Sequence, residues 1–265
     1  MEATPDCRAR HAAAPGAARR RAPPSRLAPC PTGLLALPSP LLPHPPHPSR
    51  HRQLYSQITW RFYDIFFGIV MTFDAEDAAG HVHCMLSWSR DSKTWRWVDS
   101  AGLEALKEFI PAGSNGSFDS HVCFAAHSPL RMPDGSSRVY YMGGDGPHSG
   151  ARKSSFALAT LPADRFAGMA SAKGAATVVA ATSRAVNITG AHMLVTVDVA
   201  PGGSFLVGVA GSSEFHQSKP LTATGTDVQV EFKGSPVGLA PLVGQQRQLT
   251  VTLDRATLYT IGFKA

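Results

Sequence analysis

The chain has 265 residues, 43% of them hydrophobic, which is enough to bury the core of one large domain or two ordinary ones. Its formal net charge of +6 comes from residues 1–52, which hold eight of the 25 basic and two of the 19 acidic side chains, so that 17 of each remain. A neutral body without a basic stripe argues against nucleic-acid binding. No apolar run is long enough to span a bilayer, which argues against a membrane protein.

Residues 1–52 form the first segment and contain 12 of the 21 prolines, mixed with Ala and Arg. Because proline fixes φ and removes a backbone donor, we expect this tail to be disordered, with polyproline II character. Its many arginines and few acids suggest an organelle-targeting peptide. It has few serines and no long amphipathic stretch, however, which favours a tail without function. The compartment is therefore left open.

Aromatic and β-branched runs separated by turn residues begin at Gln53 and are typical of strands. The run from Ile65 to Phe73 is continuously apolar, as expected for a strand buried on both faces. A turn is predicted at residues 90–93 and a helical or irregular stretch at 103–109. Further strands are predicted at residues 81–88, 95–98, 118–128, 138–142 and 155–160.

Two stretches of this region resemble each other. Each has a strand, a turn with an aspartate, and an aromatic residue: Asp91 with Trp95, and Asp164 with Phe166. They lie about 71 residues apart, a period compatible with a β-propeller blade, which is a four-stranded antiparallel sheet. In the first turn we expect Asp91 to accept hydrogen bonds from turn amides while Trp95 packs between strands.

Beyond residue 172 the chain changes to short alternating strands joined by glycine-containing turns, among them Pro201-Gly202-Gly203. Five or six such strands predict a β-sandwich over residues 173–265. The strands are predicted at residues 175–180, 193–199, 204–210, 228–232, 248–253 and 257–263.

The four cysteines have no spacing typical of a metal site. Cys84 and Cys123 lie in apolar runs, where we expect free cysteines that behave as small buried hydrophobic side chains. No Ser/His/Asp order and no glycine-rich phosphate loop stands out. The sequence thus predicts neither a metal site nor a cofactor.

Several motifs of the body resemble blade signatures of glycoside hydrolase families 32 and 43. These motifs are Leu86 to Trp95, Gly116 to Ser120, Val139 to Gly144 and Asp145 to His148. Three further motifs resemble the closing strands of the family 32 C-terminal sandwich, namely Leu239 to Gly244, Leu249 to Leu253 and Ala256 to Tyr259. The resemblance covers residues 53–265. It implies an all-β protein with about two blades of a five-bladed β-propeller at residues 53–172, the C-terminal β-sandwich at 173–265, and an N-terminal truncation.

The catalytic carboxylates that this resemblance implies are missing. Nothing matches the nucleophile motif of tryptophan, any residue, asparagine, aspartate and proline, and Arg90-Asp91 lacks the proline of the stabilising motif. Glu214 and Glu231 are each followed by Phe rather than by the cysteine that follows the acid/base glutamate. Retaining hydrolysis needs two carboxyl groups roughly 5 Å apart, so we identify no catalytic residue.

We therefore expect a carbohydrate-active protein of glycoside hydrolase descent that binds sugars or is inactive as this chain stands. Whether it hydrolyses O-glycosyl bonds stays open. The alternatives are a noncatalytic interaction scaffold built from blades and sandwich, and a truncated gene product. Two blades cannot close a propeller, so their open edges also predict self-association.

Asp119 and His121 are the main candidates for sugar binding. On the predicted strand 118–128, alternation places both on one side, and in the resembled propellers such strands begin at a central funnel. A carboxylate there accepts hydrogen bonds from sugar hydroxyls. The alternatives are a turn cap for Asp119 and an ordinary structural histidine for His121.

Asp145, His148 and Asp64 are weaker candidates. Asp145 and His148 lie in a glycine-rich loop, where binding residues are common, although an ordinary Asp-Gly turn is the favoured alternative. Asp64 precedes the strand at 65–73 and either faces the funnel from the neighbouring blade or is a solvated strand end.

Overall fold

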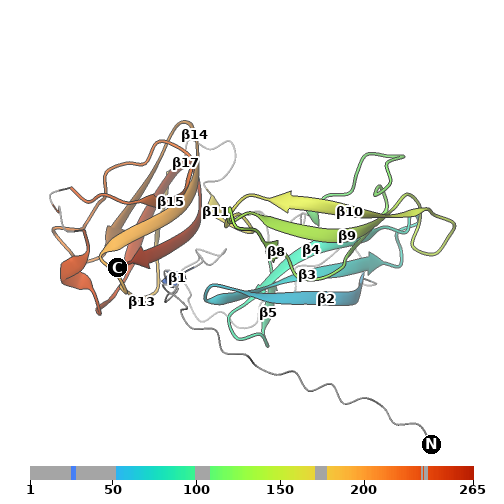
Figure 1. Ribbon diagram of the computed structural model, residues 1–265, viewed down its shortest axis with the longest axis horizontal. Coiled ribbons are helices and arrows are strands. Elements are labelled where there is room, and N and C mark those ends of the chain that lie inside the picture. The colour runs from blue at the N-terminus through green and yellow to red at the C-terminus, as the bar shows by residue number, and fades with distance from the viewer. Residues whose placement is uncertain (1–24, 28–51, 99–107, 171–177, 234, 236–237) are drawn as a thin grey trace, which may run out of the picture.

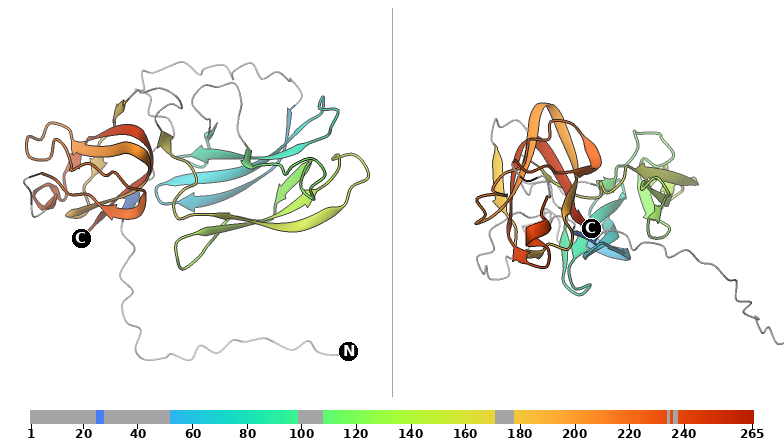
Figure 2. Two further views of the ribbon diagram at one scale, coloured as in Figure 1. Left: turned by 90° about the horizontal axis from the view of Figure 1, so that it is seen from above. Right: turned by 60° about the vertical axis from the view of Figure 1, so that its left-hand side comes forward.

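The computed structural model of the chain is all-β (Figure 1). It describes residues 25–27, 52–98, 108–170, 178–233, 235 and 238–265. Among these residues the only helical element is the short 3-10 turn η1 (Ala240–Leu242), and none forms a helix with the length and apolarity that crossing a bilayer requires. The strands form two large sheets that lie side by side along the long axis of the molecule (Figure 2).

The first sheet has nine strands, in the order β10-β9-β7-β4-β3-β2, with β5 and β6 paired to β4 and β8 paired to β9. It consists of two antiparallel meanders, one before and one after the β6–β7 loop. The strands are β2 (Arg52–Phe62), β3 (Ile65–Asp74), β4 (Val82–Ser89), β5 (Trp95–Trp97), β6 (Glu108–Ile110), β7 (Val122–Ala125), β8 (Leu130–Arg131), β9 (Ser137–Gly144) and β10 (Ser154–Leu161).

The two meanders meet between β4 and β7. Their ladder contact is a single parallel bridge between Val82 and Val122, and a disulfide joins Cys84 to Cys123 across the same junction. Both cysteines are buried, as expected, but the prediction that they are free was wrong, because the bridge brings two residues 39 positions apart within bonding reach. The disulfide therefore ties the two halves of the sheet together.

Two predictions about this sheet need correction. The strand expected at 118–128 is restricted to β7, so Asp119 and His121 precede it in a turn, and their shared side of a strand was a wrong inference. Residues 108–109, expected to be helical or irregular, belong to strand β6, while the remainder of that stretch up to residue 107 lies mostly outside the described residues.

The second sheet has six strands, in the order β1-β17-β14-β15, with β11 and β12 also paired to β17, and a separate pair is formed by β13 and β16. The strands are β1 (Ser25–Leu27), β11 (Met169–Ala170), β12 (Val179–Thr182), β13 (Val186–Asn187), β14 (His192–Val209), β15 (Gly225–Gln229), β16 (Gln246–Arg247) and β17 (Leu249–Lys264).

Strands β14 and β17 are longer than predicted because each joins two expected strands. Residues 200–203 of β14 lie opposite Arg255 alone, between the pairs Val199–Ala256 and Ser204–Asp254. Such an excess of residues on one strand is an irregular bulge, which bends the strand without ending it. Gly202 and Arg255 absorb the bend with φ values of 72° and 46°. Pro201-Gly202-Gly203 thus forms a bulge and not a hairpin turn.

Strand β1 lies within the segment expected to be disordered. Its residues pair with β17 in the register Ser25–Phe263 to Leu27–Ile261. The rest of the prediction for residues 1–51 falls outside the described residues.

The second sheet encloses one continuous core. Nineteen buried residues cluster there, including Phe205 and Leu253, which are fully buried, and both halves of β14 and β17 contribute to the cluster. In the first sheet the buried residues form two smaller clusters of ten and six. The apolar core is therefore continuous in the second sheet and divided in the first.

The segment between β10 and β11 connects the sheets through Asp164, which is buried and has a φ of 63°. Its carboxylate accepts hydrogen bonds from the Tyr63 hydroxyl of the first sheet (2.8 Å) and from Thr196 Oγ1 of the second (3.3 Å). Arg165 binds Asp198 of the second sheet (2.9 Å), and Phe166 packs into the smaller cluster of the first sheet. Three successive residues thus fasten the two sheets to each other.

Candidate functional site

Three histidines stack where β4 and β7 begin. The ring centroids of His81 and His121 are 4.9 Å apart and their planes differ by 12°, while His83 lies 5.7 Å from His81 at 29°. The backbone explains the contact, because the Val82–Val122 bridge aligns the residues that precede the two strands, and the Val82 amide donates to the His121 carbonyl (2.9 Å). We call these three side chains the histidine stack.

Two carboxylates hold the stack in place. Asp77 Oδ2 lies 2.6 Å from His81 Nδ1, and the same carboxylate accepts hydrogen bonds from the amides of Ala79 and His81. Burial raises the pKa of Asp77, but the hydrogen bonds from His81 and the Ala79 amide together outweigh it and hold the pKa below its ordinary value. Asp77 is therefore an anion at neutral pH.

Glu108 holds the His83 ring in the same way. Its Oε1 contacts His83 Nδ1, and its Oε2 accepts a hydrogen bond from the Ala112 amide (2.7 Å). Burial raises the pKa of Glu108, while the hydrogen bonds from His83 and Ala112 lower it by more, so the pKa lies below its ordinary value. Each of the two β4-side histidines is thus paired with its own carboxylate.

The third ring, His121, has its Nδ1 2.9 Å from Ser120 Oγ. All three Nδ1 atoms are therefore engaged, and in the described part of the chain no Nε2 atom of the stack has a protein partner. Because a carboxylate only accepts, Nδ1 of His81 and His83 donates to it, and in the tautomer protonated at Nδ1 alone Nε2 is an acceptor. The stack can therefore accept hydrogen bonds from a ligand.

Asp119 lies in the loop between β6 and β7 but forms its own local network. Its Oδ1 accepts a hydrogen bond from Ser117 Oγ (2.9 Å) and its Oδ2 accepts one from the Tyr141 hydroxyl (2.8 Å). Burial and the neighbouring Asp119 raise the pKa of Tyr141 to about 12. A Cβ atom on Gly143 would lie 2.6 Å from the Cβ atom of Asp119, so strand β9 requires glycine where it passes the turn of Asp119. Both carboxylate oxygens of Asp119 are thus bound to side-chain hydroxyl groups of the protein.

Asp145 and His148 lie in the β9–β10 loop, whose backbone borders the stack because the His148 amide donates to the Gly80 carbonyl (2.9 Å), but their side chains contact other groups. Asp145 Oδ1 accepts a hydrogen bond from the Lys153 amide (2.7 Å) at the start of the loop between β9 and β10. The His148 ring lies 5.0 Å from those of Tyr55 and Phe73. By strand alternation Phe73, which is opposite Val82, is on the other face of the sheet from His83. His148 therefore belongs to an aromatic cluster on that face.

Asp64 is exposed in the two-residue turn between β2 and β3. The β3–β4 ladder runs from Phe66–Ser89 to Phe73–Val82, so Asp64 and the histidine stack are at opposite ends of the sheet. A ladder of this length separates them by more than 20 Å at about 3.4 Å per residue. Asp64 and His121 do not share one site.

Sequence reasoning missed four members of the site, namely Asp77, His81, His83 and Glu108. A signal was present, because two histidines separated by one residue on a strand lie on the same face. Their meeting with His121 depends on the parallel bridge between β4 and β7, which no local pattern indicates.

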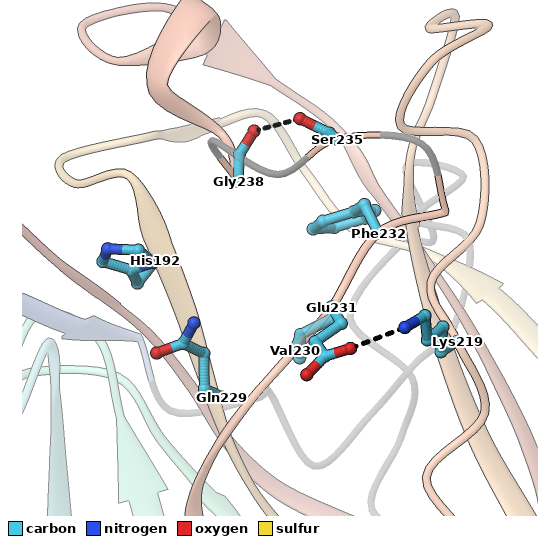
Figure 3. Close-up of a pocket in the computed structure, with 8 residues that line it drawn as sticks. All are labelled: His192, Lys219, Gln229, Val230, Glu231, Phe232, Ser235 and Gly238. Carbon is cyan, nitrogen blue, oxygen red and sulfur yellow. Dashed lines mark hydrogen bonds and ion pairs between the residues drawn. The ribbon is translucent and has the colours of Figure 1, made fainter.

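A hollow of about 460 Å³ lies on the second sheet (Figure 3). Its ionic groups, Lys219 and Glu231, pair with each other at 2.8 Å and are both exposed, so they contribute little to stability. It is lined by His192, Lys219, Gln229, Val230, Glu231, Phe232, Ser235 and Gly238.

Among the described residues, no three His, Cys, Asp or Glu side chains are arranged to hold a metal ion. The rings of the histidine stack are nearly parallel, so their Nε2 atoms do not converge on one point.

Comparison with known proteins found no family model and no curated protein that matches the chain.

Proposed function

We propose that this chain is a carbohydrate-binding protein of glycoside hydrolase descent that does not hydrolyse its ligand. The observation that carries the proposal is the histidine stack, in which His81 and His83 are fixed by carboxylates at Nδ1 and keep Nε2 available. Fixed acceptors cost little conformational entropy when they bind a hydroxyl group.

Sugars fit this arrangement because each hydroxyl is both a donor and an acceptor. In the tautomer that donates from Nδ1, Nε2 accepts from hydroxyls, and the nearby carboxylates favour ligands that donate over ligands that are anionic. Phe118, which is 45% exposed, is in the β6–β7 loop that leads to His121 and offers an apolar face for the C–H groups of a sugar ring. The proposed ligand is therefore a neutral oligosaccharide.

The ionisation of the site argues against hydrolysis. A general acid for glycoside cleavage needs a raised pKa, so that it is protonated when the leaving group departs. The pKa values of Asp77 and Glu108 are both lowered, and the oxygens of Asp119 are occupied by Ser117 and Tyr141. No protonated carboxyl group is therefore identified beside the stack.

The descent from a propeller is supported by the two meanders of the first sheet. β2, β3, β4 and β5 form a four-stranded antiparallel unit, as a blade requires, and β7, β9 and β10 begin a second. The bent strands β14 and β17, which share one core, agree with a closing sandwich.

The test is a glycan-array screen of the full chain, followed by calorimetric titration of the best ligand. His81→Phe keeps an aromatic ring against His121 but removes both ring nitrogens. We expect it to weaken binding at least tenfold. The matched control is His127→Phe, which changes an exposed histidine outside the stack and should leave the affinity unchanged.

Turnover of fructans, arabinans and aryl glycosides should be undetectable in the same preparation. Turnover that Asp119→Ala abolishes without unfolding the protein would contradict a noncatalytic role. Absence of binding to every glycan, or equal loss in both histidine variants, would refute the proposed sugar site.

A further inference from the structure

Strand β10 is one of the two edges of the nine-stranded sheet (Figure 1). It pairs with β9 over all eight residues, from Ser154–Gly144 to Leu161–Ser137, and within the described chain no strand pairs with its other side. A free edge presents unpaired amide and carbonyl groups in a row, which is a template for another strand.

The two edges of this sheet differ in how they are protected. β2 has a register shift between Leu54 and Ser56 and carries the exposed Arg61, and both features discourage pairing. β10, with the sequence SSFALATL, has no charge, no proline and no register shift along its ladder. It therefore lacks the usual features that prevent edge-to-edge association.

β10 also carries exposed apolar side chains on one face. Phe156 is 86% exposed, and Leu158, two residues on, is on the same face and opposite the exposed Tyr140 of β9. We call Tyr140, Phe156 and Leu158 the β10 strip. A phenylalanine exposed to this degree gains from any contact that covers it.

We propose that β10 pairs antiparallel with β10 of a second copy of this chain, about a two-fold axis at Ala157. This register places Phe156 of each copy opposite Leu158 of the other, on the same face. It aligns seven of the eight residues of β10, from 154 to 160, and makes the contact self-complementary, as a two-fold interface requires. The two nine-stranded sheets become one continuous sheet.

The contact is small, which sets the expected affinity. Eight residues in a strand extend about 27 Å, and an interface of one strand edge with a few side chains falls below the roughly 1,200 Å² of a standard stable complex. We therefore expect a reversible dimer with a dissociation constant in the micromolar range, about 1–100 µM.

Sedimentation analysis of the full chain at about 1–200 µM tests the dimer. We expect a monomer–dimer equilibrium that Phe156→Lys weakens at least tenfold, because the register brings a charge against the partner copy's strip. The matched control is Leu54→Lys on the β2 edge, where another exposed apolar side chain is replaced, and it should leave the equilibrium unchanged. Circular dichroism checks that both variants fold.

A monomer over the whole concentration range would overturn the proposal, as would equal loss of dimer in both variants. Growth into larger open-ended species that Leu54→Lys also prevents would indicate head-to-tail pairing of β10 with β2 instead. In a Cys7→Ser and Cys30→Ser background, Ala157→Cys should form a covalent dimer on oxidation, since the axis puts the two positions opposite each other. Failure to crosslink would refute the axis position.

Discussion

The two sheets of this protein differ in how their apolar residues are arranged. The C-terminal sheet buries 19 residues in one core, whereas the nine-stranded sheet divides its core into two clusters and leaves Phe156, Leu158 and Tyr140 on its surface. The two sheets also differ in their polar groups, because the histidine stack and its two carboxylates lie on the nine-stranded sheet. One sheet therefore has the continuous core, and the other has the candidate binding surfaces.

The difference follows from how the strands are connected. β14 and β17 pair along almost their whole length and bend together, so each contributes to the core twice. The nine-stranded sheet is held at its centre by one parallel bridge and a disulfide. The comparison makes four predictions.

The largest effect is expected from removing the same side chain in each sheet. Phe205→Ala creates a cavity in the continuous core and should lower the free energy of unfolding by about 3–5 kcal/mol. Phe156→Ala removes an exposed ring and should change it by less than about 0.5 kcal/mol. Denaturant unfolding measures both. Similar losses would contradict the burial of Phe205 and the exposure of Phe156.

The second effect concerns the disulfide. The double change Cys84→Ser and Cys123→Ser should destabilise the nine-stranded sheet by about 2–4 kcal/mol, because the reduced chain gains freedom over the 39 residues between the cysteines. Hydrogen exchange should increase in β4 and β7, while the amides of β14 and β17 keep their protection. Uniform loss of protection in both sheets would contradict a local role for the disulfide.

The third effect concerns the junction between the sheets. Asp164→Ala removes a buried acceptor from Tyr63 and Thr196, which costs about 1–3 kcal/mol for groups left unpaired. It should also separate one unfolding transition into two in calorimetry. Asp164→Asn, which tolerates the positive φ and keeps one oxygen, is the milder control. A single transition in the alanine variant would mean that other contacts couple the sheets.

The smallest effect is expected from removing the hydroxyl group of one tyrosine in each sheet. Burial, followed by hydrogen bonding to Asp119 or Asp198, raises the pKa of Tyr141 and of Tyr259 to about 12. A raised pKa stabilises the folded state below the unfolded value of about 10, and this contribution is lost as pH rises through about 12. Tyr141→Phe and Tyr259→Phe should each flatten the alkaline decline in stability. Unchanged pH profiles would contradict the two shifts.

The strand-rich character of the chain could be predicted because it depends on local patterns. The Asp91 turn was also predicted and is confirmed, since the Asp91 carboxylate accepts hydrogen bonds from the amides of Lys93 (2.9 Å) and Thr94 (2.7 Å). All of its partners are within three residues, so the sequence alone contains the information.

Asp164 has a similar local pattern but a different environment. Its partners Tyr63 and Thr196 are 101 and 32 residues away, and it is buried between two sheets. The histidine stack could not be predicted for the same reason, because His81 and His121 meet through a distant strand pairing. Contacts that depend on sheet order are not contained in local composition.

The pairing of β1 with β17 has a consequence for the synthesis of the protein. Ser25–Leu27 are among the first described residues to leave the ribosome, whereas their partners, residues 261–263, belong to the last described strand. The nine-stranded sheet can fold during translation, because all of its strands precede residue 162. The β1 ladder can form only once β17 has emerged, so its closure is a late step that follows translation of almost the whole described chain.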